Sequence, residues 1–142
     1  AVPSNVIVHY NVPPEELRKL YRRARVVVIP LYQDDHDYGF EMPGAYFSGM
    51  TVLGDCAALG KAVVMTATAS AKELLKHEYT AELVAPEDPI VLADAIRRVC
   101  SDEQYRKLLS QNMFKLYDNF SIAKTVNDFI RIIGSTVRDE SR

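Results

Sequence analysis

Residues 48–66, SGMTVLGDCAALGKAVVMT, hold the pattern from which the fold class follows. Ser48 is a residue type that caps helix N-termini, and a helix from about Gly49 to Leu59 would end at Gly60. Its core face would carry Val52, Leu53, Cys56 and Ala57. The apolar run 62–66 follows with the length and β-branched content of a strand buried on both faces. A helix that passes through a short turn into a buried strand indicates an α/β protein.

The same alternation continues on both sides of this stretch. Upstream, residues 6–10 and 26–31 are predicted strands, and between them an amphipathic helix starts at about Pro13-Pro14. Downstream we expect a short helix over 71–76, a strand over 81–85, a helix capped by Asp88, a helix opened by a capping box Ser101-x-x-Gln104, and a last helix after Ser121. Strands that alternate with helices in this way are parallel, with right-handed crossovers.

Composition narrows the class of protein. The chain has 142 residues, nearly half of them apolar, so it can bury one core. Its 17 basic and 19 acidic residues argue against general binding to polyanions. Cys56 and Cys100 have no C-x-x-C spacing for a zinc or redox site, and the chain shows neither a leader nor an apolar run of membrane-spanning length. We therefore expect a reduced, cytoplasmic protein.

Taken in order, several segments resemble the C-terminal domain of the group 1 (family 4) glycosyltransferases. These segments are 5–17, 20–30, 52–64, 73–75, 85–96 and 119–121, and the third is similar to that family's "VLLEAMACGTPVV". The family has the GT-B architecture of two facing Rossmann-like domains. The resemblance implies an α/β fold, with a Rossmann-like parallel sheet flanked by helices and extra C-terminal helices. Residues 1–142 would form a single, partial donor-binding domain that lacks the first two of the six strands, so that its partner is the missing N-terminal GT-B domain.

The resemblance also implies a function. A retaining glycosyltransferase moves a sugar from a nucleotide-diphosphate sugar, which is a substrate rather than a cofactor, to an acceptor hydroxyl. Backbone N–H groups of Ser48, Gly49, Met50 and Thr51 would bind the diphosphate at the helix N-terminus. The alternative is an ordinary helix start. No metal or further cofactor is expected.

The other predicted contacts concern the nucleoside. Asp55 stands where the family has the second glutamate of its E-x7-E motif, which binds the ribose hydroxyls, although a helical surface aspartate is also common. Tyr10, Asn11 and Val12 would border the base, and Tyr10 is alternatively a core residue. Nothing in the sequence distinguishes uracil, guanine and adenine donors.

Three departures from the family pattern put activity in doubt. Phe47 occupies the position of the first glutamate, and Glu41 in the preceding loop is either its substitute or a solvated acid. Ala69-Ser70 replaces a glycine pair, and Arg25 replaces an acid. Because the family's phosphate-binding Arg and Lys lie upstream, this chain alone is expected to be inactive. The alternatives are a non-catalytic binding or scaffolding subunit and a GT-B sugar-nucleotide epimerase.

Charged residues and histidines outside the predicted donor site suggest further hypotheses. The run Asp34-Asp35-His36-Asp37 contains metal-ligand types, but adjacent loop residues rarely converge on one ion. His9 and His77 have no evident catalytic partner in the sequence. A basic cluster on the first predicted helix and just after it suggests either contact with an anionic lipid surface or acidic partner, or a solvated helix face; it comprises Arg18, Lys19, Arg22, Arg23 and Arg25.

Overall fold

A parallel three-stranded sheet forms the centre of the molecule. The computed structural model describes residues 2–32 and 49–139. The strands β1 (Val27–Ile29), β2 (Val63–Thr66) and β3 (Glu82–Val84) lie in the order β1-β2-β3, and Val64 is aligned with Val28 on one side and Glu82 on the other. The predicted α/β class with a Rossmann-like parallel sheet is confirmed.

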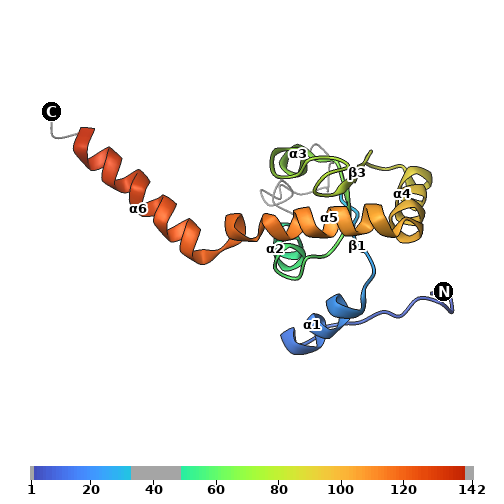
Figure 1. Cartoon of the computed structure of the whole chain (residues 1–142). Helices are drawn as coiled ribbons and strands as arrows, with labels where there is room; N and C mark the ends of the chain where they lie inside the picture. The colour runs from blue at the N-terminus through green and yellow to red at the C-terminus, as the bar shows by residue number, and fades with distance from the viewer. Residues whose placement is uncertain (1, 33–48, 140–142) are drawn as a thin grey trace, which may run out of the picture.

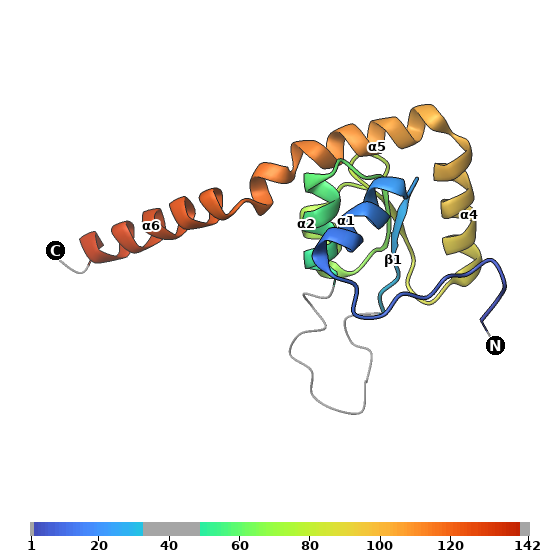
Figure 2. The same ribbon diagram turned by 90° about the horizontal axis from the view of Figure 1, so that it is seen from below.

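Helices connect the strands and continue beyond them. They are α1 (Pro14–Arg23), α2 (Met50–Ala58), α3 (Ala69–Leu74), α4 (Pro89–Ser101), α5 (Glu103–Lys115), the 3-10 helix η2 (Tyr117–Phe120) and α6 (Ile122–Asp139). Figure 1 shows α4 and α5 meeting at an elbow beside the sheet, and Figure 2 shows α1 and α2 next to each other on the opposite side. The predicted C-terminal helices are confirmed.

The pleat of β2 divides the core into two apolar clusters. Val63 and Met65 face α2, α3 and the end of α5, whereas Val64 faces α4 and the start of α5. All four β2 residues are buried because β2 is the central strand. This arrangement explains why residues 62–66 are apolar without alternation.

The prediction of a strand over residues 6–10 is wrong. This segment is extended but unpaired, and Ile7 and Tyr10 expose 80% and 84% of their surfaces. In the described residues no strand lies beside it to accept or donate ladder hydrogen bonds, and β1 pairs only with β2. An apolar, β-branched run without such a neighbour cannot form a sheet strand.

Several helix starts differ from the predicted ones by one or two residues. The N-cap of α2 is Gly49 rather than Ser48, which lies outside the described residues. The N-cap of α5 is Asp102, whose carboxylate accepts from the Tyr105 N–H at 2.9 Å, so the proposed capping box at Ser101 is wrong. The cap at Asp88 is confirmed, because its carboxylate accepts two N–H bonds of 3.0 Å from the first turn of α4.

The last helix extends away from the rest of the molecule (Figures 1 and 2). Ser121 caps it as predicted, accepting from the Lys124 N–H at 3.2 Å. Its apolar side chains are largely exposed, from 83% for Ile122 to 48% for Ile133. Among the described residues no helix is both long and apolar enough to cross a membrane.

Candidate functional site

The start of α2 is the first part of the predicted site that the structure describes. Gly49 has the left-handed φ of 81°, and the Leu53 N–H donates to its carbonyl oxygen at 2.9 Å. As the N-cap, Gly49 has no side chain that could accept from the free N–H groups of the first turn. Met50 is half-buried and Thr51 is exposed. This helix end therefore has the donors and the positive dipole end that an anion would need.

Packing against the sheet explains the glycine at position 49. A Cβ atom at this position would lie 2.9 Å from Cγ2 of Ile29 and 3.6 Å from side-chain atoms of Leu31 and Met65. The missing side chain thus points into the protein, against the ends of β1 and β2. Gly49 is required by core packing, whatever binds at the helix start.

Asp55 lies one turn further along α2 and is held by α1. It is half-buried, and its carboxylate accepts a hydrogen bond from the Tyr21 hydroxyl. Burial raises the pKa of Tyr21 to about 12, and the neighbouring Cys56 and Asp55 make smaller contributions in the same direction. Tyr21 therefore stays a neutral donor, which keeps Asp55 oriented. This carboxylate lies outside both core clusters and faces the neighbouring helix α1.

A hollow of about 270 Å³ lies between α1 and α2 beside this pair. Seven residues line it: Pro14, Leu17, Arg18, Tyr21, Asp55, Ala58 and Leu59. It combines a carboxylate, a phenol, a guanidinium and apolar surface within one space. That mixture suits a ligand with hydroxyl groups and a flat ring.

The residues predicted to border the base lie just before α1. Tyr10 is exposed rather than part of the core, Asn11 has a left-handed φ of 48°, and Val12 is half-buried. They are not among the residues that line the hollow between α1 and α2. Their role in binding stays a prediction, as do the roles of Ser48, Glu41 and Phe47, and the metal hypothesis for residues 34–37, all of which lie outside the described residues.

A second, larger hollow of about 490 Å³ lies at the carboxyl ends of the strands. It is lined by Pro30, Leu31, Tyr32, Thr66, Val84, Ala85, Glu87, Asp88, Pro89 and Leu92. The Thr66 hydroxyl accepts from the Leu31 N–H at 2.8 Å and so links the ends of β1 and β2. We missed these residues in the sequence, although the positions that follow consecutive parallel strands were a usable signal.

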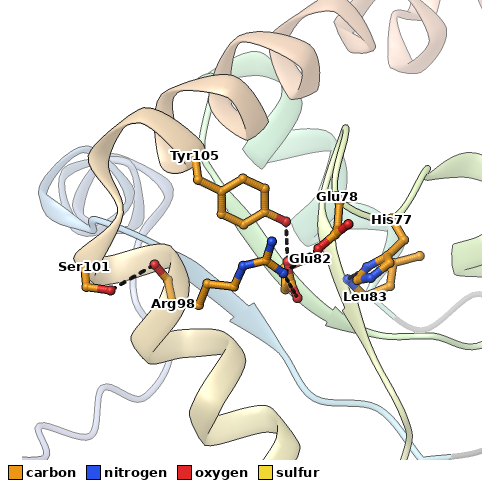
Figure 3. A network of polar contacts seen from close by, with 7 residues as sticks. All are labelled: His77, Glu78, Glu82, Leu83, Arg98, Ser101 and Tyr105. Atoms are coloured by element: carbon orange, nitrogen blue, oxygen red, sulfur yellow. Dashed lines mark hydrogen bonds and ion pairs between the residues drawn. The ribbon is translucent and has the colours of Figure 1, made fainter.

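A polar network around Glu82 joins β3 to the helices α4 and α5 (Figure 3). The buried carboxylate of Glu82 accepts from the Tyr105 hydroxyl and from Arg98 at 3.4 Å, and Arg98 also contacts Glu78 at 2.5 Å. Hydrogen bonding to Arg98 lowers the pKa of Glu78. The network ties both arms of the α4–α5 elbow to β3.

The same network has atoms that could bind a metal. One ligand atom each from His77, Glu78 and Glu82 lies within 4.8 Å of the others. However, the Arg98 guanidinium already contacts both carboxylates, and His77 Nδ1 accepts from the Leu83 N–H at 3.1 Å. These contacts satisfy the ligand atoms within the protein, so we assign the cluster a structural role.

Comparison with known proteins identifies the family to which this arrangement is similar. The family model described as glycosyl transferases group 1 matches residues 1–102. A D-inositol 3-phosphate glycosyltransferase of Salinispora tropica is 27% identical over 130 residues, which are 89% of this chain and 24% of that protein. An uncharacterized glycosyltransferase of Methanocaldococcus jannaschii is 33% identical over 118 residues, 80% of this chain and 27% of that protein. The chain thus spans about a quarter of the length of these relatives.

Solved structures show the same fold. The C-terminal domain of a group 1 glycosyl transferase family protein from Francisella tularensis superposes with a TM-score of 0.63 at 20% identity, covering 81% of this chain and 53% of that one. Sucrose-phosphate synthase from Thermosynechococcus elongatus gives a TM-score of 0.59 at 23% identity, covering 82% of this chain and 27% of that one.

Proposed function

This chain belongs to the group 1 glycosyltransferase family and has the fold of a GT-B C-terminal domain, and on that premise we propose that it is the donor-binding part of a retaining glycosyltransferase. Its ligand is a nucleotide-diphosphate sugar, from which the sugar passes to an acceptor hydroxyl with retained anomeric configuration. One observation carries the proposal: α2 joins an N-terminus without a side-chain cap to a carboxylate less than two turns further on, beside a hollow.

The dimensions of α2 suit a nucleotide. Asp55 lies six positions after Gly49, so the two points are about 9 Å apart along the helix axis. A diphosphate at the helix start then places the ribose at Asp55. Since Tyr21 takes one acceptor site of this carboxylate, the remaining lone pairs can accept from the ribose hydroxyls.

The contribution of these residues to transfer is electrostatic and positional. The departing nucleoside diphosphate gains negative charge as the glycosidic bond breaks, and the N–H groups and dipole of α2 stabilise that charge. Asp55 holds the ribose so that the sugar keeps one position relative to the acceptor. In this proposal a second GT-B domain supplies the acceptor side and further cations, the site of action is the cytoplasm, and residues 1–142 alone bind the donor without completing transfer.

The two rival functions share some of these features. A scaffolding subunit would keep the fold without binding a donor, and a sugar-nucleotide epimerase would bind it through the same ribose contact. The relatives compared above bear glycosyltransferase names, which favours transfer. Analysis of the products formed by the longer parent protein would separate transfer from epimerisation.

Calorimetric titration tests donor binding directly. The chain is titrated with UDP-, GDP- and ADP-sugars, alongside Asp55→Ala and the control Asp94→Ala, which removes an exposed aspartate on α4. We expect one donor to bind, and Asp55→Ala to weaken it by about tenfold or more, the loss typical of hydrogen bonds to a charged group. If no donor binds, or if both variants behave alike, the proposed site is wrong.

A further inference from the structure

We infer that Arg18 selects the nucleobase of the donor by favouring a base whose edge carries a carbonyl oxygen, guanine or uracil, over adenine, which has an amino group there. The inference rests on the proposed function, because it presumes a nucleotide whose ribose is held by Asp55. Arg18 belongs to the basic cluster of the first helix, for which the sequence suggested only lipid or acidic partners or solvent. In the structure, Arg18 lines the hollow between α1 and α2.

Arg18 faces the same space as the ribose-binding candidate. It lines the hollow between α1 and α2 together with Tyr21 from its own helix and Asp55 from the other. The Lys61 ammonium bonds to the carbonyl oxygens of Arg22 and Ala24 at 3.0 and 3.2 Å, which fixes the end of α1 against the start of β2. Both walls of the hollow are therefore held in place.

The guanidinium of Arg18 is also available. Elsewhere in the basic cluster, Lys19 is paired with Glu16 at 3.3 Å, and Arg25 donates to the Cys100 carbonyl oxygen at 3.2 Å. Arg18 has no hydrogen-bond or ion-pair partner among the residues that the structure describes. A ligand in the hollow would meet a cation whose five N–H donors have no protein partner within residues 2–32 and 49–139.

The orientation of the nucleotide decides which part meets Arg18. The base and the 5′-phosphate leave the ribose on opposite sides, so a diphosphate at Gly49 and a ribose at Asp55 direct the base away from the start of α2. The base then enters the hollow, where Pro14 and Leu17 offer apolar surface to its ring. Arg18 thus meets the edge of the base rather than the phosphates.

Base chemistry then gives the preference. Guanine presents two adjacent acceptors, O6 and N7, that match the fork of a guanidinium, and uracil presents a carbonyl oxygen. Adenine places an amino donor at the corresponding position, and a guanidinium has no acceptor for it. Such a contact discriminates between bases by about tenfold or more.

Titration with nucleoside diphosphates tests this without the sugar. GDP, UDP and ADP are titrated into the wild-type chain, Arg18→Ala and the matched control Arg22→Ala, which removes an arginine one turn further along α1. We expect GDP or UDP to bind the wild type about tenfold more tightly than ADP. Arg18→Ala should abolish this preference and leave ADP binding unchanged, and Arg22→Ala should keep it.

Three outcomes overturn the inference. ADP binding as tightly as GDP and UDP would show no base selection. Equal weakening of all three by Arg18→Ala would assign Arg18 to the phosphates. An unchanged preference in Arg18→Ala would assign selection to another residue. The proposed function fails in a different way: no nucleotide then binds the wild-type chain, and this inference falls with it.

Discussion

Replacement of Gly49 by alanine tests the packing of α2 against the sheet. Gly49 has φ of 81°, a conformation that residues with a Cβ atom adopt at a cost. The new methyl group would also lie 2.9 Å from Cγ2 of Ile29, which is closer than Cβ atoms approach other heavy atoms. Ile29 is 5% exposed and belongs to the apolar cluster under α2, so it has little room to move.

Both effects destabilise the folded state. The left-handed conformation costs about 1–2 kcal/mol for a residue with a Cβ atom. Insertion of a methyl group into a packed core typically costs about 1–3 kcal/mol. We therefore expect Gly49→Ala to lower the free energy of unfolding by roughly 2–5 kcal/mol, a sizeable share of the total for a domain of this size.

Gly54 offers a matched control on the same helix. It lies in the middle of α2, and a Cβ atom there would have no heavy atom within 4 Å. Gly54→Ala should stabilise the protein by about 0.5–1 kcal/mol, because alanine loses less backbone entropy in a helix.

Urea unfolding followed by far-ultraviolet circular dichroism measures both variants. The dependence of the unfolding free energy on urea should stay unchanged, so that shifts in midpoint report stability. The reasoning is refuted if Gly49→Ala unfolds within about 0.5 kcal/mol of wild type, the scatter of ordinary surface substitutions. It is also refuted if the two alanine variants shift in the same direction.

Two further predictions concern titratable groups. Because hydrogen bonding to Arg98 lowers the pKa of Glu78, this carboxylate stabilises the fold above the ordinary glutamate pKa of about 4.3, and the contribution is lost as pH falls through its lowered folded value. Glu78→Gln should flatten the fall in stability between pH 5 and pH 3, and an unchanged slope in that variant would contradict the assignment. Burial raises the pKa of the Cys56 thiol to about 12, so a disulfide reagent at pH 8 should label the half-buried Cys100 first and Cys56 only after unfolding. Fast labelling of the folded Cys100→Ser variant would show that Cys56 is accessible.

Short sequence patterns predicted the structural features that depend only on residues close together in the chain. Asp88 and Ser121 cap helices as expected, because a cap and the N–H groups it binds are neighbours in the chain. The cap is Asp102 rather than Ser101, because Ser101 is the last residue of α4 and its hydroxyl donates to the Arg98 carbonyl oxygen at 3.2 Å. The strand prediction for residues 6–10 failed for a different reason: a strand needs a hydrogen-bonding neighbour, which no local pattern can supply.

In the candidate site, too, the sequence predicted the local features but not the contacts between distant segments. The order of apolar runs, caps and glycines along the chain was enough to establish the α/β class, the family resemblance and the position of Asp55 one turn after the start of α2. The sequence did not show its surroundings, because Tyr21, which contacts Asp55, and Arg18, which lines the same hollow, come from a helix more than thirty residues earlier in the chain. The direction of the missing Gly49 side chain, toward Ile29, likewise depends on how α2 packs on the sheet. Such contacts between distant segments depend on how α1 and α2 pack beside the sheet, and this packing exists only once the strands have paired.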